Sequence, residues 1–364
     1  MYQALYRKYR PKEFKDFVGQ DDIKTILLNS LKNNTINHAY LFSGPRGTGK
    51  TTAAKLLAKS VNCLNFENEP CGNCENCNRI SENSVDILEI DAASNNGVDE
   101  IRELRNKVNL VPSELKYKVY IIDEVHMLTT GAFNALLKTL EEPPKHVIFI
   151  LATTDLHKVP ITIISRCQTI NFKRISDKEI AKRLKFIAKS ENIEIEEDVL
   201  KEIAEYSSGG LRDAIGMLDK LSTYTSRVIT LEDFYKLNGL ESKETTKLIV
   251  QAILEGKKKE IINIIETLNN SGADSIFFIK ELIKSLKDTL VNNIKNNEET
   301  NVDNVYELIF VLNDILIKQQ NIDVLLYLEV NLLKFVKLNE VDKVPKIISR
   351  EIILEEKIKE KDVE

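Results

Sequence analysis

The stretch GPRGTGKT, Gly44 to Thr51, decides the fold of this chain. It follows an apolar run, Tyr40 to Phe42, that is typical of a buried strand. It leads into TTAAKLLAKSV, whose apolar residues have the spacing of a helix. A glycine-rich loop between a strand and a helix is the setting in which backbone N–H groups bind the phosphates of a nucleotide. The sequence therefore predicts a phosphate-binding loop.

Each part of this loop has an expected role. The glycines allow unusual backbone dihedrals and a close approach of the backbone to phosphate. Lys50 is expected to supply a positive charge to the β- and γ-phosphates, and Thr51 a hydroxyl ligand for Mg²⁺. The predicted nucleotide-binding residues are Gly44, Pro45, Arg46, Gly47, Thr48, Gly49, Lys50 and Thr51.

The opening segment, which continues as YRKYRPKEFKDFVGQ from Tyr6, is predicted to lie beside the base of the nucleotide. Pro11 and Gly19 interrupt it before a helical pattern begins. We expect Tyr6, Arg7 and Val18 to contact the purine ring. The alternative is an ordinary surface arm that packs a ring or two.

Two adjacent carboxylates, Asp123 and Glu124, follow the β-favouring run Val119 to Ile122. In an open parallel sheet this position places both side chains beside the nucleotide. We assign Asp123 to Mg²⁺ and expect Glu124 to orient and polarise the attacking water. His126 lies next to this pair, and either a structural hydrogen bond or a coupling role fits it.

Four of the five cysteines, at 63, 71, 74 and 77, form the pattern C-x7-C-x2-C-x2-C, and Cys167 stands apart. Crowding of this kind in a cytosolic chain indicates a metal rather than disulfides. Four thiolates, each with a metal–sulfur distance of about 2.3 Å, select Zn²⁺ in a closed structural site. We therefore predict that Cys63, Cys71, Cys74 and Cys77 bind zinc in an insert at about residues 61–80. Redox thiols and an iron–sulfur cluster are the alternatives.

Length and charge constrain the architecture. A chain of 364 residues with 43% hydrophobic and 29% charged residues is expected to be a soluble globular protein of two or three domains. It contains no signal-like segment and no run of eighteen apolar residues, so we expect a cytoplasmic location and no membrane partner. The net charge of the chain is −5, but residues 1–175 hold 23 Lys and Arg against 20 Asp and Glu and are therefore slightly basic. The overall acidic charge thus does not exclude a nucleic-acid partner for this part of the chain.

Strands and helices alternate as far as Phe172, which predicts an α/β core with a parallel sheet and helices on both faces. We expect every strand to be apolar on both faces. The remaining expected strands end at Asp91, run from Val147 to Thr154, and lie near Phe172. Only helices are predicted beyond Ser176: Asp177 to Asn192, Glu196 to Ser207, Leu211 to Tyr224, Leu231 to Leu237, and others beginning near Glu244, Lys258, Ser275, Val302 and Ile322. The charge-dense stretch Glu351 to Glu364 is predicted to be a solvated helix or a frayed tail.

The phosphate loop, the acidic pair, the cysteine insert and the string Ser165-Arg166-Cys167 together resemble the gamma/tau subunits of the bacterial DNA polymerase III clamp loader. That family belongs to the AAA+ ATPases. The resemblance covers the first 240 residues closely and the rest more loosely. It implies a P-loop AAA+ core at 1–175, an all-α lid at 176–240 and an all-α collar at 241–364 through which subunits form a ring. The implied activity is ATP hydrolysis that opens the sliding clamp and loads it onto primed DNA during replication.

The resemblance assigns three further residues. Thr154 corresponds to the polar sensor of the γ-phosphate, with Thr153 as the other candidate. Arg166 corresponds to the arginine finger, which reaches the ATP site of the adjacent subunit. Arg212 corresponds to the second sensor, which closes the lid on ATP. An arginine offered in trans would leave the site incomplete in a monomer.

The implied partners are other clamp-loader subunits in a hetero-oligomeric ring, the sliding clamp, and primed DNA held by its backbone. Single-strand-binding protein is a further candidate. For DNA, Arg102, Arg105 and Lys107 are the most clustered basic residues, although their helix could equally be a solvated face. The first cysteine gap is seven residues, where about eight is expected. Long forms of the family continue with segments that bind helicase and polymerase, and we do not assign those functions here.

Three other functions compete with this interpretation. A related loader subunit that has lost its phosphate loop is excluded, because Lys50, Thr51 and the acidic pair are all present. A stand-alone AAA+ DNA-remodelling ATPase leaves the cysteine insert unexplained. A ring scaffold with minor hydrolysis predicts no stimulation of ATP turnover by clamp and primed DNA.

Overall fold

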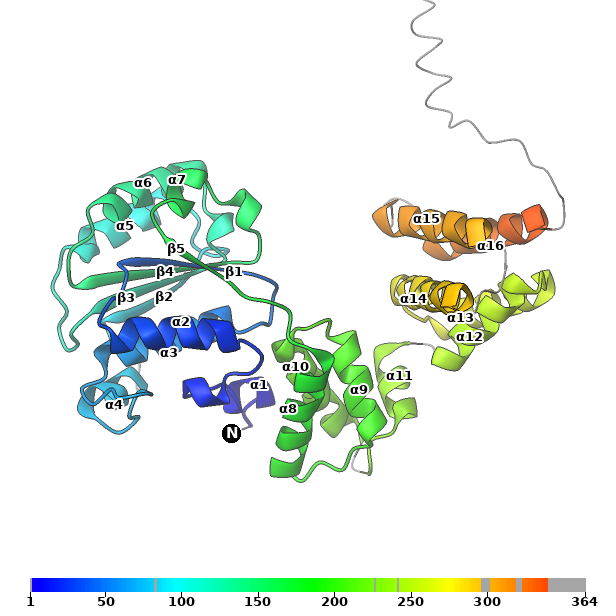
Figure 1. Cartoon of the computed structure of the whole chain (residues 1–364), viewed down its shortest axis with the longest axis horizontal. Coiled ribbons are helices and arrows are strands. Elements are labelled where there is room, and N and C mark those ends of the chain that lie inside the picture. Colours follow the sequence, from blue (N-terminus) through cyan, green and yellow to red (C-terminus); the bar gives the residue numbers. More distant parts are fainter. Residues whose placement is uncertain are drawn as a thin grey trace, which may run out of the picture. The chain divides into compact units, whose positions relative to one another are not determined.

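The computed structural model describes residues 2–81, 84–225, 227–240, 242–295, 302–318 and 323–339. The chain divides into two compact units, Met1–Leu231 and Glu232–Glu364, which we describe separately (Figure 1). The unit boundary lies at the start of helix α11 (Leu231–Asn238). The finer division into three domains stays a prediction. Within the described residues, no helix combines the length and apolar character needed to cross a membrane.

The first unit is built on a five-stranded sheet with the order β2-β3-β4-β1-β5, in which all pairs are parallel. Its strands are β1 (Ala39–Ser43), β2 (Ile87–Asp91), β3 (Lys118–Asp123), β4 (Val147–Thr153) and β5 (Gln168–Asn171). Each predicted strand is confirmed. Because β1 pairs with both β4 and β5, the phosphate loop leaves the sheet from an interior strand.

The expectation that every strand is apolar on both faces is wrong for the two edges. Residues of β1 and β4 are buried throughout, as are all but the last residue of β3. By contrast, β2 and β5 contain exposed residues. An edge strand has a neighbour on one side only, so part of its surface stays in contact with water.

Helices cover both faces of this sheet, as predicted (Figure 1). Tyr40 and Phe42 of β1 lie in one apolar cluster with side chains of α2 and α3, whereas Leu41 lies in a second cluster with side chains of α5 and α6. This alternation follows from the two-residue period of a strand. The helices of this α/β part are α1 (Leu5–Lys8), α2 (Asp21–Lys32), α3 (Lys50–Asn62), α4 (Glu75–Ser81), α5 (Val98–Val108), α6 (Thr130–Glu141) and α7 (Ile161–Ile164), with short 3₁₀ turns η1 (Phe14–Asp16), η2 (Val125–Met127) and η3 (Leu156–Lys158).

Three helices complete the first unit: α8 (Asp177–Ser190), α9 (Glu197–Tyr206) and α10 (Leu211–Tyr224). The first begins with a capping box, in which Ser176 accepts from the backbone of Glu179 and the Glu179 carboxylate accepts in return. Buried apolar residues lie at helical spacing along each of them, which explains why the three pack together. The predicted lid helices are therefore confirmed as elements.

The second unit consists of helices around their own apolar cluster of isoleucine, leucine, phenylalanine and valine side chains. After α11, these are α12 (Lys243–Leu254), α13 (Lys258–Ser271), α14 (Ser275–Lys295), α15 (Val302–Lys318) and α16 (Val324–Asn339). The predicted helix starts are confirmed to within two residues. The predicted tail at Glu351 to Glu364 lies outside the described residues.

Candidate nucleotide site and cysteine cluster

The loop between β1 and α3 has a backbone that only glycine adopts without strain. Gly44, Gly47 and Gly49 have φ of 141°, 76° and 101°. A Cβ at Gly44 would lie 2.3 Å from the carbonyl oxygen of Phe172, and one at Gly49 would lie 2.5 Å from the ring of Phe17. The loop is thus closely packed on its protein side and fits a phosphate cradle at the start of α3.

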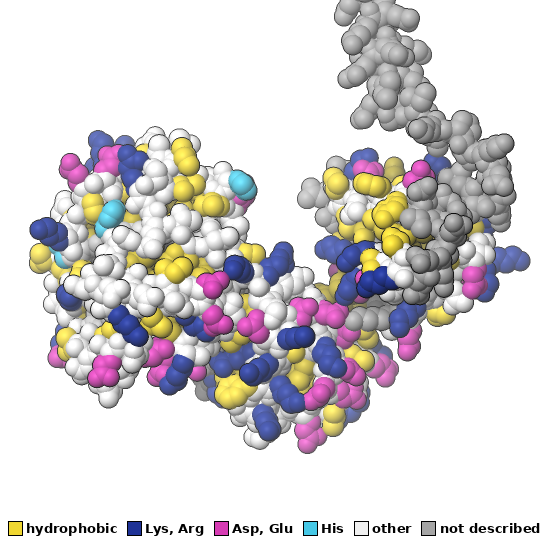
Figure 2. Space-filling view, viewed as in Figure 1, with side chains coloured by type: hydrophobic (Ala, Val, Ile, Leu, Met, Phe, Trp, Pro, Cys, Tyr) yellow, Lys and Arg dark blue, Asp and Glu magenta, His cyan; other side chains and the backbone are white. Residues whose placement is uncertain are grey.

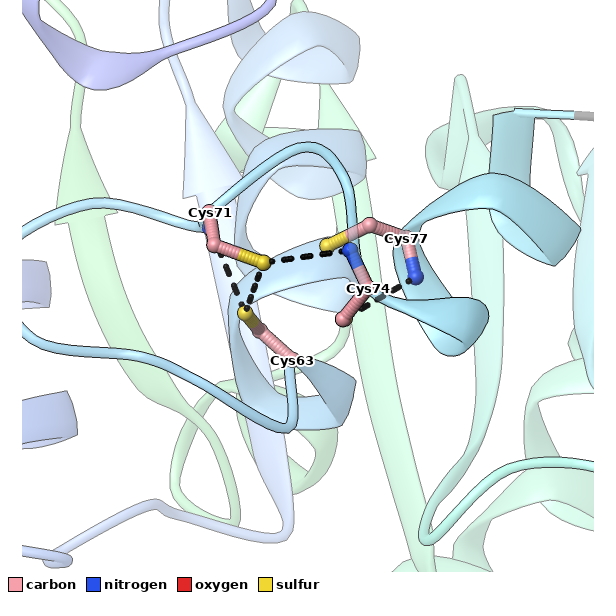
Figure 3. A group of neighbouring side chains, drawn as sticks. All are labelled: Cys63, Cys71, Cys74 and Cys77. Atoms are coloured by element: carbon pink, nitrogen blue, oxygen red, sulfur yellow. Dashed lines mark hydrogen bonds between the residues drawn. The ribbon is translucent and has the colours of Figure 1, made fainter.

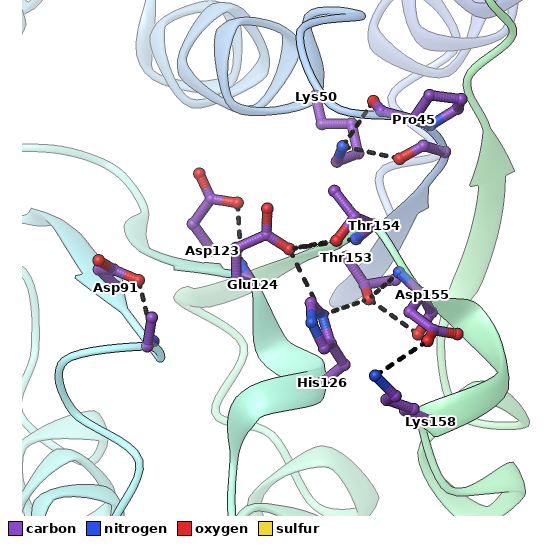
Figure 4. A network of polar contacts seen from close by, with 12 residues as sticks. Pro45, Lys50, Asp91, Asp123, Glu124, His126, Thr153, Thr154, Asp155 and Lys158 are labelled. Carbon is purple, nitrogen blue, oxygen red and sulfur yellow. Dashed lines mark hydrogen bonds and ion pairs between the residues drawn. The ribbon is translucent and has the colours of Figure 1, made fainter. Parts of the chain in front are cut away.

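Lys50 is buried at the first position of α3, with 6% of its surface exposed. Its Nζ donates to the carbonyl oxygens of Gly44 at 2.8 Å and Pro45 at 2.9 Å (Figure 4). Burial lowers the pKa of Lys50, while the nearby carboxylates of Glu124 and Asp123 oppose that effect. The ammonium group is therefore held inside the loop.

Thr51 and Asp123 are brought together, as predicted for a magnesium site. The Thr51 hydroxyl donates to Asp123 Oδ2 at 2.6 Å, and the backbone N–H of Glu124 donates to Oδ1 at 2.9 Å. A hydroxyl and a carboxylate beside a phosphate loop are the oxygen ligands that Mg²⁺ prefers. The residues present therefore fit this ion.

Glu124 is held by the end of β4. Its Oε2 accepts from the Thr154 backbone N–H at 3.2 Å and from the Thr154 hydroxyl at 2.8 Å (Figure 4). Glu124 has a left-handed backbone with φ of 48°, which is uncommon for a residue other than glycine. Of the two candidate sensors, Thr154 is the one that contacts Glu124.

His126 joins the same network through Thr153. The Thr153 hydroxyl donates to the carbonyl oxygen of Asp155 at 3.0 Å, so its single proton is used there. The contact of 3.0 Å with His126 Nδ1 must then be donated by the imidazole, which assigns the proton to Nδ1. The same nitrogen lies 3.4 Å from Glu124 Oε2. His126 therefore faces the acidic pair.

An open cleft of about 630 Å³ adjoins these groups. It is lined by Gly44, Pro45, Arg46, Ala93, Glu124, His126, Met127, Thr154 and Arg174. The sequence reasoning missed Arg174, which follows β5 and also donates to the carbonyl oxygen of Ser208. The available signal was a basic pair, Lys173 and Arg174, directly after the last strand of the sheet.

The opening arm lies against the helices that follow the sheet. The Tyr6 ring lies 5.0 Å from the Arg212 guanidinium and 5.8 Å from that of Arg7. The backbone N–H of Leu5 donates to Asp219 of α10 at 3.1 Å. The structure thus joins two predicted nucleotide-binding residues, Tyr6 and Arg212, by a cation–π contact. Val18 is half-buried, and the purine contacts stay a prediction.

Arg166 is not brought to the phosphate loop. Its guanidinium pairs with Glu141 of α6 at 2.6 Å and donates to the carbonyl oxygen of Thr162 at 2.7 Å. One third of its side chain is exposed. A role within its own site is therefore unsupported, and the predicted role in trans stays a prediction.

The four clustered cysteines converge as predicted (Figure 3). All their Sγ atoms lie within 4.8 Å of one another. Tetrahedral zinc with bonds of about 2.3 Å requires sulfur separations of roughly 3.8 Å, so the donor set fits this ion. Burial raises the pKa of Cys74, but hydrogen bonds from the backbone of Cys77 and Leu64 and from neighbouring thiols lower it to about 6. A backbone hydrogen bond at Asn73 also lowers the pKa of Cys71, whereas burial raises the pKa of Cys63 and of Cys77. Cys71 and Cys74 therefore favour thiolate, and Cys63 and Cys77 do not.

Asparagine side chains fix this cluster to the core. Asn62 ends α3 directly before the first cysteine, and its amide accepts from the backbone of Tyr117 at 2.7 Å, next to β3. Asn76 donates to the carbonyl oxygen of Asn62 at 2.8 Å. Both asparagines are buried.

Two of the three basic residues of α5, Arg102 and Lys107, pair with acidic residues of their own helix. Arg102 pairs with Asp99 at 3.1 Å, and Lys107 lies 3.9 Å from Glu103. Basic and acidic side chains are intermingled on the face of the molecule shown in Figure 2. These pairs do not distinguish a DNA contact from a solvated face, so the assignment stays a prediction.

Comparison with protein families gives two matches. Residues 19–176 match the family described as DNA polymerase III, delta subunit, and residues 182–223 match the RCF1/5-like, AAA+ ATPase lid domain. The chain is similar in fold to a RuvB variant from Thermotoga maritima, with a TM-score of 0.50, 20% identity, and coverage of 75% of this chain and 87% of that one.

Two relatives are similar over most of this chain. DNA polymerase III subunit tau of Bacillus subtilis is 49% identical over 80% of this chain and 52% of its own length. DNA polymerase III subunit gamma of Buchnera aphidicola subsp. Acyrthosiphon pisum is 37% identical over 85% of this chain and 92% of its own length. The chain thus spans about half the length of the tau relative and nearly all of the gamma relative.

Proposed function

Because the chain belongs to the DNA polymerase III gamma/tau family, we propose that it is the ATPase subunit of a clamp loader. In this role, ATP binding and hydrolysis open the sliding clamp and load it onto primed DNA. The observation that carries the proposal is the cluster of Lys50, Thr51, Asp123 and Glu124 beside the glycine loop. A ring scaffold would not need all four groups.

The chain's own residues divide the work of hydrolysis. The loop backbone and Lys50 bind the β- and γ-phosphates. Glu124 orients and polarises the attacking water, and Thr154, already bonded to Glu124, couples that carboxylate to the γ-phosphate. Thr51 and Asp123 would hold Mg²⁺, which supplies charge neutralisation on the phosphates.

Two arginines complete the site in this proposal. Arg212, at the start of α10, approaches the phosphates when α8–α10 close as a lid. Arg166 acts on the neighbouring subunit, and its position away from the phosphate loop, in contact with Glu141 of α6 and Thr162 of α7, agrees with that role. The domains would then be an ATPase core at 1–175, a lid at 176–240 and a collar at 241–364 that assembles the ring.

The remaining assignments follow from the same family. Cys63, Cys71, Cys74 and Cys77 would hold a structural Zn²⁺. The proposed partners are the other loader subunits, the sliding clamp, the backbone of primed DNA, and single-strand-binding protein, in the cytoplasm.

The test is ATP turnover by the chain assembled with the other loader subunits, with and without clamp and primed DNA. We expect stimulation by both together, and we expect Lys50→Ala to abolish it. Turnover that is unaffected by clamp and primed DNA would support a scaffold. Full turnover by the isolated chain on DNA alone would support a stand-alone remodelling ATPase.

A further inference from the structure

We propose that the cysteine module, the insert at about residues 61–80, stabilises the conformation of the phosphate loop through Glu69. Metal binding at the four cysteines and nucleotide binding at the loop would then be coupled. This inference rests on the proposed nucleotide and zinc sites. The module would thus have a structural role inside its own subunit. Three sets of contacts connect the cysteines to the phosphate loop.

The first step is a carboxylate that binds two backbone groups of the opening arm. Glu69 Oε2 accepts from the N–H of Phe14 at 2.7 Å, and Oε1 accepts from the N–H of Lys15 at 2.9 Å. These N–H groups begin the turn η1, where no residue of a 3₁₀ turn can satisfy them from within. Glu69 therefore fixes the position of η1.

The second step joins Glu69 to the metal site. Glu69 is separated from Cys71 only by Pro70, which is buried. Proline fixes its own φ and restricts the residue before it to extended conformations. The Cys71 backbone N–H also donates to the sulfur of Cys63 at 3.3 Å. A metal that holds these two sulfurs would therefore hold the segment that positions Glu69.

The third step runs from η1 to the phosphate loop. Phe14 and Phe17 are buried, and the Phe17 backbone N–H donates to the carbonyl oxygen of Phe14 at 3.1 Å. The Phe17 ring is the group that a Cβ at Gly49 would meet at 2.5 Å. The same ring packs edge-on against Phe172, whose carbonyl oxygen lies against Gly44. Phe17 thus supports both ends of the loop.

These contacts make the loop sensitive to the module. Without the Glu69 carboxylate, two N–H groups at the start of η1 lose their partner, and η1 is held only by its buried aromatic side chains. Phe17 would then hold Gly49 less firmly, and the nucleotide would have to supply part of the ordering of the loop. Ordering on binding reduces affinity, and two sites that order the same segment are positively coupled.

The experiment measures affinity for a fluorescent ATP analogue in the full chain, with zinc content determined on the same samples. We expect Glu69→Ala to retain zinc but to bind the analogue about tenfold more weakly, within the usual range for coupled sites. Glu67→Ala is the matched control, because Glu67 lies exposed in the same loop, and it should bind as the wild type does.

A second measurement removes the zinc with a chelator. We expect wild-type affinity for the analogue to fall by a factor similar to that of Glu69→Ala, and we expect chelation to add nothing in Glu69→Ala, because both changes break the same link. If Glu69→Ala fails to fold, Glu69→Gln keeps one acceptor oxygen and should give an intermediate loss.

Each outcome separates this inference from the proposed function. Wild-type affinity that does not respond to zinc removal overturns the coupling. Equal losses on chelation in wild type and Glu69→Ala show that the metal acts by another route. If the zinc-loaded wild type fails to bind the analogue, the proposed function fails instead.

Discussion

The Thr51 hydroxyl lies 2.6 Å from Asp123 Oδ2, although 72 residues separate the two in the chain. If they bind Mg²⁺ together, Thr51→Val should raise the Mg²⁺ concentration for half-maximal ATP turnover by about tenfold or more. Thr52→Val is the control, because the Thr52 hydroxyl faces Arg10 of the arm instead. An unchanged Mg²⁺ titration in Thr51→Val would remove Thr51 from the ion site.

His126 offers a sharper test of the acidic pair. An asparagine places its N–H₂ near the position of Nδ1, and a glutamine places it near Nε2. His126→Asn should therefore keep the donor toward Thr153 and Glu124, whereas His126→Gln should lose about tenfold in kcat, the value of one hydrogen bond. Nucleotide affinity should stay constant in both variants. Equal kcat values would indicate that the imidazole only fills space.

Arg174 lines the cleft, and its guanidinium is suited to phosphate. Arg174→Ala should weaken ATP binding by about tenfold, as expected for loss of a charged hydrogen bond. Lys173→Ala is the matched control, since Lys173 pairs with Asp22 at 3.0 Å on an exposed surface. Calorimetric titration of both variants with ATP decides the matter, and equal affinities would exclude Arg174 from the site.

Arg166 should matter only after assembly. Arg166→Ala should bind ATP normally but lose stimulated turnover in the assembled ring by up to about 10³- to 10⁵-fold, the range for arginine fingers. Glu141→Gln, which removes the present partner of Arg166, should leave stimulated turnover at or above wild type. Normal stimulated turnover in an Arg166→Ala ring would refute the assignment.

Cys167 should behave as a structural thiol. Burial raises its pKa to about 12, so in the folded chain it stays protonated through neutral and mildly alkaline pH. The same thiol in the unfolded chain ionises at a lower pH. Cys167 therefore contributes to the stability of the folded chain below the pKa of the unfolded thiol, and this contribution is lost as the pH rises toward 12. Alkylation at pH 8, followed by mass spectrometry, should label Cys167 only after denaturation. Rapid labelling of the native chain would contradict this.

The elements of the fold were readable from sequence because each has a strong local signal. Apolar runs marked every strand, and the spacing of isoleucine and leucine marked the helices beyond Ser176. The exposure of the edge strands was not predicted, because an apolar run such as Ile87–Asp91 does not reveal how many neighbouring strands it has in the sheet. Sheet order depends on contacts between distant segments, and no local pattern encodes it.

The candidate site could be predicted where the strands and helices expected around a motif support its interpretation. The glycine loop and the acidic pair fall together as expected. Arg174 was missed because a basic pair after a strand forms no recognised motif, and only the folded chain brings Arg174 to the cleft. The contact between Tyr6 and Arg212 likewise joins segments from opposite ends of the first unit, so periodicity could not reveal it.

The position of β1 in the sheet governs when a newly made chain becomes competent to bind ATP. The loop follows β1 near the start of the chain, but both partners of β1, β4 and β5, are synthesised much later. Even Gly44 donates its N–H to Thr153, at the end of β4. Pairing over such separations is slow, and domains fold as units once complete. A nascent chain that stops before β5 therefore contains the loop sequence but cannot yet hold it in its folded conformation. Nucleotide binding then requires that the whole sheet has been synthesised and folded.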